Sequence, residues 1–93
     1  MQVAANLDEL ARRYVWWQPP AQTLSRRDHL LCQVMQLAIA EDVELARRSF
    51  GDDAFREALR RAPPGIFDMR SWTFWHQFWF HSPPPMLPVR SLP

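Results

Sequence analysis

The chain has 93 residues and a mass of 11.0 kDa, which fits one small domain and excludes a second independent hydrophobic core. Ten acidic and eleven basic residues leave a net charge of +1, so the chain has no overall field that would hold nucleic acid or an anionic membrane. Hydrophobic residues make up 47% of the sequence and glycine occurs only twice, a composition that excludes intrinsic disorder and favours a packed core.

Cysteine usage and hydropathy indicate the cellular setting. Cys32 is the single cysteine and has no partner for an internal disulfide. The first residues lack the charged-then-apolar run of a secretion signal, and no apolar stretch approaches the ~20 residues that span a bilayer. We therefore expect a cytoplasmic protein in a reducing environment, with no membrane association.

The first expected element is a short amphipathic helix over about residues 7–15. Asn6 followed by Glu9 resembles a capping box, which marks a helix N-terminus. Apolar side chains then recur at helical spacing, at Leu7, Leu10, Ala11 and Tyr14. The pair Pro19-Pro20 follows, and because a residue before proline avoids the α region, the helix should end by Gln18.

A second helix is expected to open near Ser25 and Asp28, which are typical of a helix N-terminus. The apolar residues that follow cover an arc of roughly 220° on a helical wheel, so this should be the central and most buried helix. They are Leu30, Leu31, Cys32, Val34, Met35, Leu37, Ala38 and Ile39. Beyond Ile39 the apolar stripe rotates, which predicts a break near Ala40 and a further helix through Val43, Ala46 and Phe50.

The remaining elements follow from glycine and proline signals. Gly51 fits a helix stop, with Asp52 or Asp53 as the next N-cap and a fourth helix whose inner face carries Phe55, Ala58, Leu59 and Ala62. Pro63-Pro64-Gly65 predicts a turn, after which Asp68 or Ser71 should cap a last helix over about residues 69–80. The period-two alternation of strands is absent beyond short fragments, so the fold class is all-α, a compact bundle of four to five short helices.

We divide the chain into a flexible N-terminus (residues 1–5), a single helical domain (6–81) and an extended proline-rich tail (82–93). The tail sequence from Pro85 to Arg90 matches a PxxPx-Arg pattern that a polyproline-binding groove recognises. Prolines also serve simply to end a chain in an extended arm, which is the interpretation we favour for these residues.

The last helix concentrates the aromatic residues. Six large rings lie within nine positions, at Trp72, Phe74, Trp75, Phe78, Trp79 and Phe80. On a helical wheel they cover about 240°, more than one neighbouring groove accepts in so small a domain. Either the tail folds back over the surplus rings, or the surplus forms a protein-binding surface, with Trp anchors and Arg70 nearby as in interface hot spots. We expect the contact residues to be Trp72, Trp75, Phe78, Trp79, Phe80 and Arg70.

The basic residues are all arginine, and most lie beside acids, as on solvated helix faces. A nucleic-acid contact, if present, would use Arg56, Arg60 and Arg61 on the fourth expected helix. Asp53 and Glu57 lie beside these arginines on the same helix, which weakens a helix-turn-helix interpretation.

Motifs for catalysis and metal binding are missing. His29 and Cys32 are three residues apart without a second ligand pair at usable spacing, so Cys32 is expected to be a small core thiol. His76 and His81 point about 140° away from each other on a helix. The sequence has no paired carboxylates, glycine-rich phosphate loop or serine triad pattern. We expect no metal, no cofactor and no small-molecule substrate, and therefore no enzyme.

Several short segments, in this order, carry a resemblance to a known group of proteins. They are Val15-Trp16-Trp17, Val34-Met35-Gln36-Leu37, Glu41-Asp42-Val43, Phe50-Gly51, Arg56-Glu57-Ala58-Leu59 and Arg70-Ser71-Trp72-Thr73-Phe74-Trp75. Across about residues 7–88 the chain resembles small all-helical bacterial proteins encoded beside nucleotidyltransferase-like toxins of the abortive-infection type. The resemblance implies an antitoxin or partner role for a helical protein and supplies no catalytic residues.

The sequence therefore predicts a non-enzymatic protein-interaction module, most concretely an antitoxin-like subunit that neutralises a nucleotidyltransferase-like toxin by binding it. Two alternatives remain open. One is a small DNA-binding regulator, and the other is a structural homodimer whose aromatic helices pair with each other.

Overall fold

The computed structural model describes residues 6–88, which form helices and connecting turns without a strand in that range. The helices are α1 (Leu7–Tyr14), α2 (Pro20–Ser25), α3 (Arg27–Leu37), α4 (Ala40–Phe50), α5 (Asp52–Arg60) and α6 (Met69–Phe80). The all-α prediction is confirmed, but the helices number six rather than four or five. The flexible N-terminus expected at residues 1–5 and the end of the tail lie outside the described residues.

The extra helix is α2, which lies between the first two expected helices, where the sequence predicted no element. Pro19 adopts an extended conformation as N-cap, and Pro20 is the first helical residue. Proline is tolerated there because its missing N–H would have no helical partner in the first turn. Ser25 therefore ends α2 instead of opening the next helix, and its hydroxyl donates to the Gln22 carbonyl at 2.7 Å. The next helix begins at Arg27.

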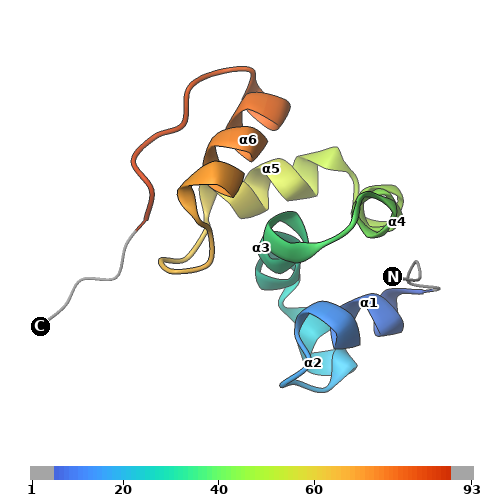
Figure 1. Cartoon of the computed structure of the whole chain (residues 1–93). Helices are drawn as coiled ribbons and strands as arrows, with labels where there is room; N and C mark the ends of the chain where they lie inside the picture. The colour runs from blue at the N-terminus through green and yellow to red at the C-terminus, as the bar shows by residue number, and fades with distance from the viewer. Residues whose placement is uncertain (1–5, 89–93) are drawn as a thin grey trace, which may run out of the picture.

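Helix α3 is the centre of the molecule, as predicted. It contacts each of the other five helices, and Figure 1 shows it between α1 and α2 on one side and α5 and α6 on the other. Its buried residues are Leu30, Leu31, Cys32, Val34 and Met35. Leu37, which the helical wheel placed on the apolar arc, is exposed instead.

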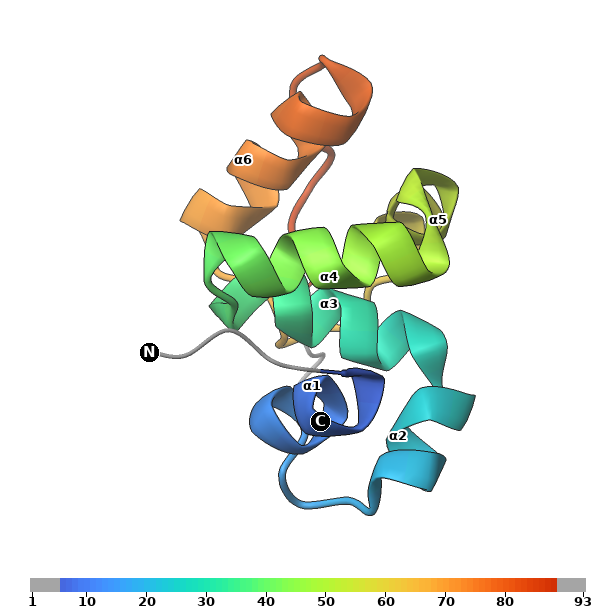
Figure 2. The ribbon, with the colours of Figure 1, turned by 90° about the vertical axis from the view of Figure 1, so that its right-hand side faces the viewer.

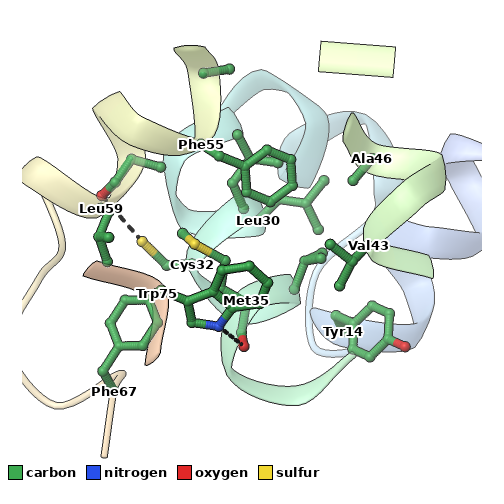
Figure 3. Packing of buried hydrophobic residues seen from close by; sticks show 14 of the residues in the cluster. Tyr14, Leu30, Cys32, Met35, Val43, Ala46, Phe55, Leu59, Phe67 and Trp75 are labelled. Atoms are coloured by element: carbon green, nitrogen blue, oxygen red, sulfur yellow. Dashed lines mark hydrogen bonds between the residues drawn. The ribbon is translucent and has the colours of Figure 1, made fainter. Parts of the chain in front are cut away.

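The predicted break between the third and fourth helices is confirmed at Ala38 and Ile39, which are both extended. The break leaves the Met35 carbonyl without an intrahelical partner, and the Trp75 indole Nε1 donates to it at 2.7 Å (Figure 3). A side chain from α6 therefore caps the last turn of α3. After the break the chain turns back, and α4 runs beside α3 in the opposite direction (Figure 2).

Gly51 ends α4 as predicted, but it is also the N-cap of α5. Its φ of 88° lies in a region that favours glycine. The expected capping by Asp52 or Asp53 is wrong because both are already helical. Asp52 instead pairs with Arg47 of α4, with Nε and Oδ1 2.9 Å apart. This ion pair links the end of α4 to the start of α5.

The remaining helix ends agree with the sequence. Asn6 accepts a hydrogen bond from the Glu9 amide at 2.9 Å and caps α1. Asp68 accepts from the Ser71 amide at 2.8 Å and caps α6. The Gln36 side chain also donates to Asp68, at 3.0 Å, which ties the start of α6 to α3.

One buried carboxylate joins the first and fourth helices. Asp42 is fully buried near the start of α4. It accepts hydrogen bonds from the Tyr14 hydroxyl at 2.5 Å and from the Arg13 guanidinium at 2.8 Å. Burial of a charge is costly unless it is paired and hydrogen-bonded, and here α1 supplies both partners.

Candidate protein-interaction surface

Helix α6 carries its aromatic rings on two faces. Trp72, Trp75 and Trp79 are buried in the core, whereas Phe74 and Phe78 are 54% and 42% exposed. Part of the aromatic surplus that the helical wheel indicated therefore stays exposed. Of the three tryptophans expected as contact residues, Trp75 lies against α3 and Trp79 against α5. Trp72 lies under the chain's own Pro85 segment.

The exposed pair forms a continuous surface that we call the aromatic ridge, Phe74 and Phe78. The two rings are stacked, with centroids 5.9 Å apart and an interplanar angle of 19°. Trp75 packs edge-on against both, at 4.8 Å from Phe74 and 5.3 Å from Phe78. The ridge is therefore packed against a buried ring.

Arg47 of α4 fixes the other side of the ridge. Its guanidinium lies 5.6 Å from the Phe78 ring centroid and 5.4 Å from that of Trp79, within the range of cation–π attraction. Glu44 accepts from the same guanidinium at 2.7 Å. The hydrogen bonds to Asp52, together with the charges of both acids, raise the pKa of Arg47, and the Arg47 hydrogen bond lowers the pKa of Asp52.

Two open hollows flank the ridge. One, of about 370 Å³, lies between α4 and α6 and is lined by Ala38, Ala40, Val43, Glu44, Arg47, Phe74, Trp75 and Phe78. The other, of about 470 Å³, lies toward the C-terminal end of α6 and is lined by Arg47, Asp52, Arg56, Phe74, Gln77, Phe78, Trp79 and His81. A raised aromatic pair between two hollows with a charged edge has the composition of a protein-binding surface.

The other two predicted contact residues do not join the ridge. Arg70 is exposed near the start of α6. Phe80 is partly buried on a different side of the helix, under the Arg60 guanidinium at 4.8 Å. Of the predicted contact set, only Phe78 therefore belongs to the aromatic ridge.

The three arginines proposed for nucleic acid are each paired with an acid. Arg56 lies 2.7 Å from Asp53, Arg60 lies 2.8 Å from Glu57, and Arg61 contacts Glu57 at 3.3 Å. Arg56 and Arg60 also lie over rings of α6. Their charge is therefore partly balanced by Asp53 and Glu57, which weakens the nucleic-acid interpretation.

Another hollow, of about 610 Å³, lies at the start of α3 and is open to solvent. Arg26, Arg27 and Arg61 line it together with Asp28. Asp28 lies 3.8 Å from Arg27 and 3.6 Å from Arg61, so part of this positive charge is balanced.

Cys32 is a core thiol, as predicted. It is buried and donates to the Ala58 carbonyl at 3.4 Å (Figure 3). Burial, with a smaller contribution from the Asp28 charge, raises the pKa of the Cys32 thiol to about 12. It is therefore protonated at neutral pH and unsuited to act as a nucleophile.

Residues 6–88 contain no group of three or more His, Cys, Asp or Glu side chains that could hold a metal ion. His29 lies against the Trp17 ring, with centroids 6.0 Å apart. None of the helices in the same range is long and apolar enough to cross a lipid bilayer.

A second exposed aromatic pair was not singled out from the sequence. Trp16 and Trp17 follow α1 and are 70% and 50% exposed, with their rings edge-to-face at 4.9 Å. They lie near α1 and α2, at the end of the molecule away from α6 (Figure 1). The available signal was two adjacent tryptophans placed between a helix and a proline pair.

No protein-family profile, curated protein or solved structure matches this chain.

Proposed function

We propose that the chain is a non-enzymatic protein-interaction module that binds a protein partner through the aromatic ridge, Phe74 and Phe78. The exposure of these two stacked rings on an ordered helix carries the proposal. Truncation of aromatic anchors in protein interfaces typically costs about 2 kcal/mol or more each, so a pair of them suffices as the centre of a contact.

The specific partner that we propose is a nucleotidyltransferase-like toxin, which the chain would neutralise by occlusion. This part rests on the resemblance described above, together with a surface suited to protein contact. Inhibition by binding alone requires no reactive group from the chain. The Cys32 thiol, whose pKa burial raises, is protonated at neutral pH and is not such a group.

Co-expression with the product of a neighbouring nucleotidyltransferase gene, followed by co-purification, tests the proposal. We expect a stable complex and relief of toxicity. The double variant Phe74→Ser with Phe78→Ser should lose both, whereas Trp16→Ser, which removes an exposed ring elsewhere, should retain both. A wild-type chain that neither binds the toxin nor relieves its toxicity contradicts the proposal, and sedimentation of the isolated chain distinguishes a homodimer.

A further inference from the structure

A groove between α5 and α6 lies on a different side of α6 from the aromatic ridge. Trp72, His76 and Phe80 follow one another at four-residue spacing and form its wall. The Trp72 and His76 rings are 4.1 Å apart and edge-to-face, and His76 and Phe80 are 5.8 Å apart. Leu59 and Arg60 of α5 line the opposite side.

The ring of His76 is fixed in this wall. Its Nδ1 lies 2.9 Å from the Trp72 carbonyl oxygen, and because a carbonyl only accepts, Nδ1 carries the proton. The Trp72 indole directs its own N–H into the groove, toward the segment that follows α6. The groove therefore combines flat ring surfaces with one directed donor.

The chain's own proline-rich segment occupies this groove. His81 adopts a left-handed conformation, which turns the chain at the end of α6, and the segment then runs back beside that helix (Figure 1). The Trp72 Nε1 donates to the Pro85 carbonyl at 2.8 Å. Pro83 and Pro85 line the groove, and Leu87 packs against the core beyond it.

These contacts match the way in which aromatic grooves recognise proline-rich peptides. Proline has no N–H and a fixed φ, and a residue before proline avoids the α region. Pro83-Pro84-Pro85 is thus a preformed extended segment whose carbonyls only accept. Aromatic walls with an indole donor supply what such a segment needs, namely flat surfaces for its rings and a hydrogen bond for its carbonyl.

The segment is held loosely. Ser82, Pro83, Pro85 and Met86 are all exposed. A hollow of about 320 Å³ remains between the segment and the groove wall. Few buried contacts and exposed backbone are typical of a segment that opens locally at low cost.

We propose that the groove of Trp72, His76 and Phe80 is a binding site for a proline-rich segment of a partner protein, closed in the free chain by residues 83–88. The site is separate from the aromatic ridge, so this inference does not depend on the identity of the partner bound there. If the closed form is about 90–99% populated, closure lowers the apparent affinity for an external segment by about 10- to 100-fold.

The test uses the full-length chain and a fluorescent peptide with the sequence of residues 82–90. An open variant carries Pro83→Gly, Pro85→Gly and Leu87→Ser, which weaken the binding of the chain's own segment to the groove. We expect this variant to bind the peptide at least about 10-fold more tightly than the wild type does. A peptide carrying the same three substitutions should not bind.

Substitutions in the groove provide the specificity control. Trp72→Phe in the open variant should abolish the gain in affinity, because phenylalanine keeps an aromatic ring but has no donor. Trp79→Phe is the matched control, since the buried Trp79 Nε1 has no hydrogen-bond partner in the described part of the chain. The indole ¹⁵N–¹H resonance of Trp72 should shift with the peptide, and that of Trp79 should not.

Three results would overturn the proposal. One is an open variant that keeps its helical circular dichroism but gains no affinity. Another is equal binding of the substituted peptide. The third is a wild-type dimer that the tail substitutions dissociate, which would show that a second copy's segment fills the groove.

Discussion

Tyr14 and Asp42 lie 28 residues apart in the sequence, and the Tyr14 hydroxyl donates to the buried Asp42 carboxylate at 2.5 Å. Because a hydrogen bond to a charged group contributes about 1.5–3 kcal/mol, Tyr14→Phe should lower the free energy of unfolding by that amount. Urea denaturation measures it. Asp53→Asn, at an almost fully exposed side chain, is the control and should cost less than about 1 kcal/mol. Equal effects of the two substitutions would contradict this role for Asp42.

The Trp75 indole should contribute more to stability through its hydrogen bond than the Trp79 indole does. Trp75 Nε1 caps the Met35 carbonyl, whereas Trp79 Nε1 has no partner in residues 6–88. Both substitutions to phenylalanine lose similar apolar area, but Trp75→Phe also leaves a buried carbonyl unsatisfied, which costs about 1–3 kcal/mol more. Thermal unfolding of the two variants compares them directly, and a larger loss for Trp79→Phe would be inconsistent with the capping role.

The Tyr14–Asp42 and Trp75–Met35 hydrogen bonds are long-range contacts that the spacing of apolar residues cannot predict. The spacing of apolar residues indicated the central helix and the break after Ile39, and capping residues marked α1 and α6. Asp42 looked like an ordinary acid in a first helical turn, since nothing local shows that Tyr14 and Arg13 lie opposite. Long-range pairing depends on how helices cross, which the local sequence pattern does not determine.

The candidate surface could be predicted only in part, because the sequence does not show how α6 packs against the other helices. The number of rings in α6 exceeded what one groove accepts, and Phe74 and Phe78 are exposed. The helical wheel does not show which side of α6 faces α3 and α5. The three tryptophans were therefore predicted as contact residues because they are the largest rings, and in the structure they are buried in the core. Helix α2 was missed because Pro20 begins a helix as readily as it ends one.

His81 should be a site where glycine stabilises the chain. It is the residue other than glycine with positive φ in residues 6–88, at 54°, and a left-handed conformation costs an L-residue about 1–2 kcal/mol. After the greater entropy of glycine in the unfolded chain is subtracted, His81→Gly should raise the free energy of unfolding by about 0.5–1 kcal/mol. Ser82→Gly is the neighbouring control, and a loss of stability on His81→Gly would contradict the geometry.

Stability should fall as the pH is lowered through the range in which His29 titrates. Burial, and then the Arg26 charge, lower the pKa of His29 from its ordinary value of 6.5. The unfolded chain then binds the proton more readily, so this stabilisation is fully present above about pH 6.5 and is lost as the pH falls toward and through the lowered pKa. Denaturation at pH 7.5 and pH 5.5 measures the slope. His29→Gln should flatten it, and an unchanged slope in that variant would assign the effect to other groups.

The dissociation constant of the full chain for its toxin-type partner tests the central claim most directly. Isothermal titration would compare the wild type with Phe74→Ser, Phe78→Ser and the Trp16→Ser control, after circular dichroism has shown that each is folded. At about 2 kcal/mol per anchor, each ridge substitution should weaken binding by about 30-fold, and the control should leave it unchanged. Ridge variants that bind as tightly as the wild type, with Trp16→Ser alone weakened, would contradict the account and move the contact to the opposite end of the molecule.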